Sequence, residues 1–191
     1  MKKKLTMVVS LLLVMALSIG GTLAYLTDKT EAVKNTFTIG NVKIDLTETD
    51  VENNETPLAN SYKMIPGQEI AKDPKVTVEA GSEACWLFVK IEKSTGFDTY
   101  ITSAIADGWT QLSGVDGVYY IDQAAVTADT PYSVLKGDKV TVNTAVTQAM
   151  MDAIADKTVA EPTMTITAYA IQKAGFADAA AAWAELTTPT V

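Results

Sequence analysis

The sequence predicts a mainly β protein, an antiparallel β-sandwich or jelly roll with short helices in the connections, preceded by an N-terminal signal helix. Three observations lead to this fold class. Several segments alternate apolar and polar residues with a period of two, turn-forming residues separate these segments, and the first 24 residues form an apolar stretch behind a cluster of lysines. Short strands punctuated by turns are typical of sandwiches and barrels.

Residues 1–24 have the organisation of a cleaved secretory signal. Three lysines follow Met1, residues 5–19 are mostly apolar, and the small residues Thr22 and Ala24 precede Tyr25. The apolar run is shorter than the roughly 20 residues of a membrane span. We therefore expect a signal peptidase to recognise Thr22, Ala24 and Tyr25 and to cleave after Ala24. A retained N-terminal anchor is the alternative. We expect the chain to contact the membrane only through the signal, as long as it is uncleaved.

The remaining chain divides into a leader and a domain. Residues 25–36 are either a strand donated to another copy or a polar, disordered leader, and the sequence leaves both open. Residues 37–191 are the expected β-sandwich domain, which is long enough to bury a core without disulfides. Its apolar alternation shifts by one residue at Gly40-Asn41, which indicates a bulge or a tight turn. The acidic residues 47–60 are typical of a solvated loop.

Alternation predicts the later strands as well. They are expected within residues 35–48, interrupted at Gly40-Asn41, and at 75–79, 84–93, 117–126, 139–146 and 162–172. Residues 84–93 are apolar on both faces at their start, which predicts a strand buried on both sides. Short helices are expected at residues 98–106, at 147–156 behind a Thr147 cap, and at 177–186.

Composition excludes several function classes. The chain has a net charge of −8, no arginine, no histidine and a single cysteine, Cys85. Nucleic-acid binding needs a dense basic surface, and His-based zinc sites, Ser–His–Asp catalysis and internal disulfides need residues that are absent. Cys85, Trp86, Trp109 and Trp183 lie in apolar stretches and are expected in the core. We therefore predict a protein that is not an enzyme and that has no metal and no cofactor, with calcium at residues 45–55 as a minor alternative.

Two segments near the N-terminus resemble a known family. Residues 20–28 read GGTLAYLTD and residues 35–46 read NTFTIGNVKIDL, followed by MIPG at 64–67 and KDP at 72–74. This pattern resembles the TasA/camelysin family of exported proteins of Gram-positive bacteria, which are processed by the signal peptidase SipW. The resemblance implies a secreted jelly-roll subunit of extracellular fibres in the biofilm matrix.

The resemblance also implies a mode of assembly. Subunits of the family join head-to-tail by donor-strand complementation, and here Tyr25, Leu26, Val33 and Phe37 would be the donor residues that engage the next copy. The implied partners are a second copy of the chain, a SipW-type signal peptidase and other matrix proteins. A monomeric accessory protein that binds a fibre subunit or a cell-wall glycan is the main alternative. A camelysin-type metalloprotease is a third, although this sequence lacks both histidine and a zincin motif.

Overall fold

The computed structural model describes residues 40–50 and 60–188. Every described residue belongs to one compact unit, Ile39–Val191. The predicted signal helix and the predicted leader therefore lie outside the described residues. So do all six residues predicted to act in cleavage or self-assembly, which are Thr22, Ala24, Tyr25, Leu26, Val33 and Phe37.

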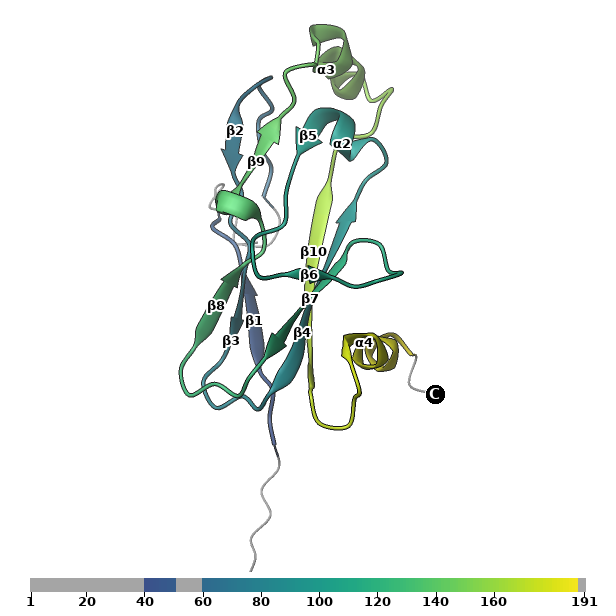
Figure 1. Ribbon diagram of the computed structural model, residues 1–191. Coiled ribbons are helices and arrows are strands. Elements are labelled where there is room, and N and C mark those ends of the chain that lie inside the picture. The colour runs from purple at the N-terminus through teal and green to yellow at the C-terminus, as the bar shows by residue number, and fades with distance from the viewer. Residues whose placement is uncertain (1–39, 51–59, 189–191) are drawn as a thin grey trace, which may run out of the picture. The chain divides into compact units, whose positions relative to one another are not determined.

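The described residues form three antiparallel sheets (Figure 1). The first contains β1 (Ile44–Thr47), β3 (Lys75–Val78) and β8 (Thr130–Ser133), in that order. The second contains β10 (Met164–Gln172), β4 (Cys85–Lys93), β7 (Val118–Gln123) and β6 (Thr110–Gln111). The third contains β2 (Glu69–Ala71), β9 (Lys139–Val142) and β5 (Ile101–Thr102). The predicted mainly β, antiparallel class is confirmed, and the jelly-roll connectivity stays a prediction.

The first and third sheets share two stretches of chain. Residues 72–74 connect β2 to β3, and β8 leads to β9 through the single turn η1 (Lys136–Asp138). Hydrogen bonds continue across this break, since the Val134 amide donates to the Pro74 carbonyl and the Lys72 amide to the Asp138 carbonyl, both at 2.9 Å. The two small sheets are thus successive parts of one interrupted ladder.

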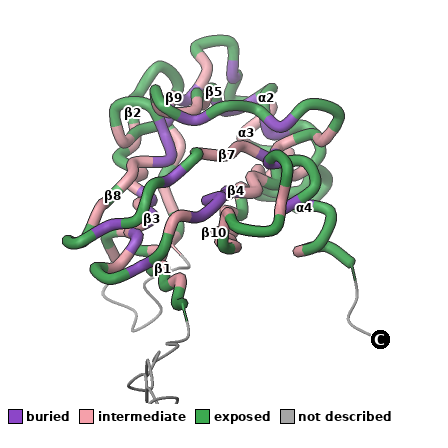
Figure 2. The backbone as a smooth tube through the Cα atoms, turned by 60° about the horizontal axis from the view of Figure 1, so that its bottom comes forward, coloured by how far each residue is buried: buried purple, intermediate pink, exposed green. Residues whose placement is uncertain are grey.

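The main core lies between the first sheet and one face of the second. Val76 and Val78 of β3 pack with Leu87 and Val89 of β4, and all four are fully buried. Figure 2 shows this buried stretch along β4. Burial on both faces explains the apolar composition of β4, because the alternate residues Trp86 and Phe88 face a second core.

The second core is covered by α4 (Ala179–Thr187). Trp183 of this helix packs on Phe88 and Tyr169, with ring centroids 5.2 and 5.3 Å apart respectively. The helix begins after Asp178, whose side chain accepts a hydrogen bond from the Ala181 amide at 2.8 Å. The predictions of a helix here and of buried tryptophans are confirmed, because Trp86, Trp109 and Trp183 are each 8% exposed.

The third core joins the small β2-β9-β5 sheet to α2 (Phe97–Tyr100) and α3 (Gln148–Ala155). The cap predicted for α3 is confirmed, because the Thr147 side chain accepts from the Met150 amide. The helix predicted over residues 98–106 is wrong beyond Tyr100. There the chain enters β5, where the β-branched Ile101 pairs with Val142 of β9 and packs into this core.

Candidate functional site

The outer edge of β10 is the longest sheet edge without a paired strand among the described residues. Its register on β4 determines which backbone groups face outward. The Ser94 amide donates to Thr163 and the Lys173 amide to Ala84, so the odd-numbered residues of β10 bond to β4. The backbone N–H and C=O groups of the even-numbered residues therefore point away from β4. These residues are Met164, Ile166, Ala168, Ala170 and Gln172.

A second edge of the same kind lies beside β10. β1 pairs only with β3 among the described residues, and the Glu79 amide donates to the Lys43 carbonyl, which places the odd-numbered residues of β1 in the ladder. The backbone groups of Ile44 and Leu46 consequently point away from β3. Since β1 and β10 lie close together, two rows of backbone donors and acceptors border the same side of the main core.

A pocket of about 300 Å³ lies at one end of this side. It is lined by residues 40–42, by Glu83 and by Ala170, Ile171 and Gln172 of β10. Gly40 lies against Glu83 here, because a Cβ at Gly40 would be 3.3 Å from the Glu83 Cγ. The first described residues of the chain thus pass directly beside the unpaired end of β10. Together the two edges and this pocket form the candidate assembly site.

Sequence reasoning identified only part of this site. It predicted β10 and its half-buried character, which the structure confirms. It did not identify the unpaired edge, because alternation within one strand reports which face is buried but not which neighbour pairs on each side. The residues predicted for cleavage and donation stay predictions, as they lie outside the described part of the chain.

Cys85 has no role in this site. Its side chain is fully buried at the start of β4, and burial raises the pKa of its thiol to about 11, with Asp122 adding to the effect. A neutral, buried thiol is a poor nucleophile and a poor metal ligand. The prediction of a core cysteine is confirmed.

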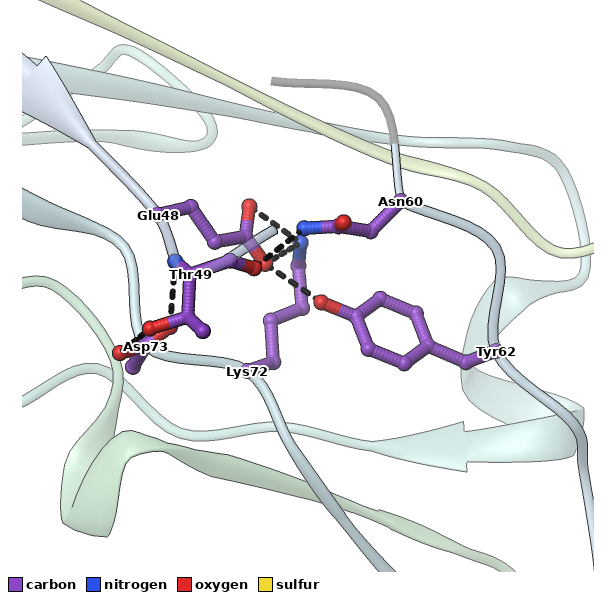
Figure 3. A network of polar contacts seen from close by, with 6 residues as sticks. All are labelled: Glu48, Thr49, Asn60, Tyr62, Lys72 and Asp73. Carbon is purple, nitrogen blue, oxygen red and sulfur yellow. Dashed lines mark hydrogen bonds and ion pairs between the residues drawn. The ribbon is translucent and has the colours of Figure 1, made fainter. Parts of the chain in front are cut away.

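A second feature is a polar cluster where β1 ends and β2 leads into β3 (Figure 3). The Lys72 ammonium donates to Glu48 at 2.9 and 3.1 Å, and the Tyr62 hydroxyl donates to Glu48 Oε1 at 2.7 Å. Lys72 Nζ also lies 5.6 Å from the centre of the Tyr62 ring. Burial raises the pKa of Tyr62, and the hydrogen bond to Glu48 raises it further. The phenol therefore acts as a donor at any physiological pH.

The same cluster continues through Thr49, Asn60 and Asp73. Thr49 donates to Asp73 from its amide at 3.0 Å and from its hydroxyl at 2.7 Å, and the Asn60 amide donates to the Thr49 carbonyl at 2.9 Å. Burial acts to raise the pKa of Asp73, but the bonds from Thr49, together with Lys75, outweigh it and lower the pKa. The prediction that residues 47–60 are solvated is therefore wrong at Glu48, whose side chain is only 10% exposed.

Neither feature fits a peptidase metal centre. The sequence contains no histidine. Within residues 40–50 and 60–188, no three His, Cys, Asp or Glu side chains are placed to hold one metal ion. We accordingly derive no metal-dependent step from this structure.

Comparison with known proteins relates this geometry to a family. Residues 1–84 match the family model of the camelysin metallo-endopeptidases. The match confirms the resemblance to the TasA/camelysin family. It contains β1, β2, β3 and the whole polar cluster, whereas β10 lies outside the matched part of this camelysin-like chain. No curated protein and no solved structure matched the sequence. In the described part of the chain, none of the helices has the length and apolar character needed to cross a bilayer.

Proposed function

We propose that this chain is an exported structural subunit of extracellular fibres in a biofilm matrix. After cleavage behind Ala24, the leader of one copy pairs with the open β1–β10 side of the next. The single observation that carries this proposal is the row of outward-pointing backbone groups along β10, next to a second such row on β1. Unpaired strand edges are templates for an added strand.

The arrangement supports a head-to-tail polymer. A donor that leaves one copy at its N-terminus and binds the side of another makes two different surfaces meet, so the contact repeats without closing. Alternate donor side chains would enter the main core, beside Ile166, Ala168 and Ala170 of β10. We expect the apolar residues of the leader and of the segment after it, such as Leu26, Val33 and Phe37, to take these positions.

The test blocks the β10 edge without breaking the ladder. Ala168→Pro removes an N–H that points away from β4, so the β10–β4 pairing is kept. The outer edge of β10 loses one hydrogen-bond donor, and the proline ring stands in the way of an added strand. We expect the exported protein with this change to unfold at nearly the wild-type temperature. We also expect its filament yield, counted by negative-stain microscopy, to fall by about tenfold or more because one inserted proline disrupts a short edge pairing.

The matched control lies at the opposite edge of the same sheet. The Leu112 amide bonds to the Val118 carbonyl, so the Gln111 amide points away from β7, and Gln111→Pro blocks the β6 edge instead. We expect this variant to form filaments normally. Equal yields from the two proline variants, or from proteins with and without residues 25–34, would contradict assembly at β10. A protein that stays monomeric throughout would favour the accessory-protein alternative.

The family description gives peptidase activity as the other candidate. It predicts casein cleavage that a chelator stops and added zinc restores. We expect purified protein to leave casein intact under all three conditions, since the described residues do not fit a metal centre. Chelator-sensitive cleavage by the purified chain would contradict the structural role as its sole function.

A further inference from the structure

The Lys72–Glu48 pair differs in burial from every other ion pair of the described residues. The Lys72 side chain is 13% exposed and that of Glu48 is 10% exposed, whereas both partners of each other pair are at least 31% exposed. Removing two charges from water is costly, and a close ion pair recovers this cost only in part. The Glu48 carboxylate, in direct contact with the Lys72 amino group, is placed to take its proton when the amine reacts.

An amide that an amine can attack lies at the same place. Asn60 bonds to the carbonyl of Thr49, the residue next to Glu48, and its side chain also interacts with the Tyr62 hydroxyl. That hydroxyl donates to the same Glu48 oxygen that Lys72 contacts. Figure 3 shows the Asn60 and Lys72 side chains both ending beside Glu48 and Thr49, where the Asn60 amide reaches the Thr49 carbonyl and the Lys72 amino group reaches the Glu48 carboxylate.

We propose that Lys72 and Asn60 form an intramolecular isopeptide bond, with Glu48 as the group that transfers the proton. The Lys72 ammonium gives a proton to Glu48, and the resulting neutral amine attacks the Asn60 Cγ. The protonated Glu48 donates to the Asn60 side-chain oxygen, which makes Cγ a better electrophile. A C–N bond forms, and the attacking nitrogen passes its second proton to Nδ2. The Cγ–Nδ2 bond then breaks, and Glu48 returns the first proton to the departing ammonia, which leaves as ammonium. The lysine ammonium and the asparagine amide thus yield one secondary amide and one ammonium ion, with no oxidant and no cofactor.

The surroundings of the cluster suit this reaction. Tyr62 holds the carboxylate by its hydroxyl and covers Lys72 with its ring, which limits the access of water. Fixed neighbours convert the attack into a unimolecular step, for which effective molarities of roughly 10⁵ M and above are known. The product removes the buried lysine charge and ties Asn60 covalently to the junction between β2 and β3. This inference does not depend on the proposed fibre function.

The decisive experiment is mass spectrometry of the intact purified chain. We expect a mass about 17 Da below that calculated for the residues of the purified chain, because one ammonia is lost. A cyclised asparagine loses the same mass, so the protein is also digested and the peptides are sequenced. A branched peptide in which the Lys72 side chain is joined to the Asn60 side chain identifies the bond.

Three variants separate the reaction from other causes. Glu48→Gln keeps the shape but cannot transfer the proton, and Lys72→Arg keeps the positive charge but supplies no amine that attacks. We expect both to show the full sequence mass and no branched peptide. Glu69→Gln removes the acid of the exposed Lys139–Glu69 pair and serves as the control, which retains the branched peptide. Thermal unfolding of each variant checks that it is folded.

The proposal is overturned by a folded wild-type protein that keeps its full sequence mass. It is equally overturned by a branched peptide that persists in Glu48→Gln, or by a loss of about 17 Da that persists in Lys72→Arg, because an isopeptide bond at this position requires both residues.

Discussion

At the residue scale, Gly117 lies immediately before β7. Its φ is +70°, and its carbonyl accepts a hydrogen bond from the Ile91 amide at 2.8 Å. A Cβ at this position would collide with the Ile91 carbonyl oxygen, which the ladder holds in place. Gly114 has a similar φ of +77°, but nothing lies within 4 Å of its Cβ position. A side chain at Gly114 would therefore cause backbone strain alone, whereas one at Gly117 would cause both backbone strain and a steric collision.

We predict that Gly117→Ala destabilises the protein more than Gly114→Ala does. The left-handed conformation alone costs an alanine about 1–2 kcal/mol, and displacing a strand carbonyl adds about 1–3 kcal/mol at Gly117 only. Urea unfolding of the two variants measures the difference in the free energy of unfolding. An equal decrease in the free energy of unfolding for both variants would contradict this prediction, because it would show that the Ile91 carbonyl shifts without destabilising the β4–β7 ladder.

Cys85 gives the second prediction at this scale, a pH dependence of stability. Burial holds the thiol pKa at about 11, against 9.0 for the free group. Below pH 9 the thiol is neutral in both states, whereas between pH 9 and 11 it ionises only when the chain unfolds. The free energy of unfolding therefore falls in this window by up to about 1.4 kcal/mol per pH unit.

Cys85→Ala isolates that contribution. The variant starts from a lower stability because a buried group is removed, but its unfolding free energy should fall less steeply between pH 9 and 10.5. Tyr62, whose pKa is also raised by burial, remains in both proteins and cancels in the comparison. Tyr132, whose pKa is raised by burial and also by Cys85, cancels only in part, so its change belongs to the Cys85 contribution. Identical slopes for the two proteins, measured by urea unfolding, would contradict a buried thiol.

Helix caps provide the prediction at the scale of elements. Asp178 accepts from Ala181 at 2.8 Å at the start of α4, which buries Ala179, Ala182 and Trp183. Thr147 accepts from Met150 at a longer 3.4 Å at the start of α3, which has no buried residue. We expect Asp178→Ala to cost about 1 kcal/mol of unfolding free energy and Thr147→Ala less. A larger loss for Thr147→Ala in thermal unfolding would contradict this order.

Element length explains how much of the fold the sequence predicts. β4 and β10 have nine residues each, enough for alternation to be recognised, and both are predicted correctly. The unpredicted strands β2, β5 and β6 have two or three residues, too few to show a period. β8 has four residues, as many as the predicted β1, β3 and β9, but its sequence TPYS lacks their alternation of apolar and polar residues. Residues 101–106 have apolar residues at helical spacing, yet the pairing of Ile101 with Val142 overrides it.

The candidate sites are less predictable than the strands because their residues meet only in the folded chain. Tyr62 follows Glu48 by 14 positions in the sequence, and Lys72 follows it by 24. No local pattern relates residues so far apart. The sequence places Glu48 in an acidic segment that is typical of a solvated loop. Only the register at the end of β1 brings it beside residues 72 and 73.

At the scale of the whole molecule, the two outer layers depend on the second sheet. One face of β4 supports the main core beneath β3, and the other supports the aromatic core beneath α4. The 104–109 segment also packs on the main core through Ile105, Ala106 and Trp109, and Trp109 donates to the Ser133 carbonyl. The open side at β10 borders this main core. Adding a strand there would extend an ordered surface, which lowers the entropy cost of association.

Net charge affects the rate at which copies of the chain associate. The chain has a charge of −8, and removal of residues 1–24, which contain three lysines and no acidic residue, leaves 12 lysines against 23 acids, or −11. Like-charged copies repel one another at low ionic strength, and the Debye length shortens from about 30 Å at 0.01 M salt to about 8 Å at 0.15 M. Strand pairing through backbone hydrogen bonds and apolar side chains is affected far less by salt.

We therefore predict that assembly of the exported protein accelerates as sodium chloride rises from about 0.01 to 0.15 M, by roughly tenfold or more in rate. Light scattering at a fixed protein concentration measures the rate, and sucrose of equal osmolality controls for effects that are not ionic. The Ala168→Pro variant should remain unassembled at every salt concentration, since screening does not restore a blocked edge. Assembly that slows with added salt would instead show that attraction between charged groups, and not an added strand, joins the copies.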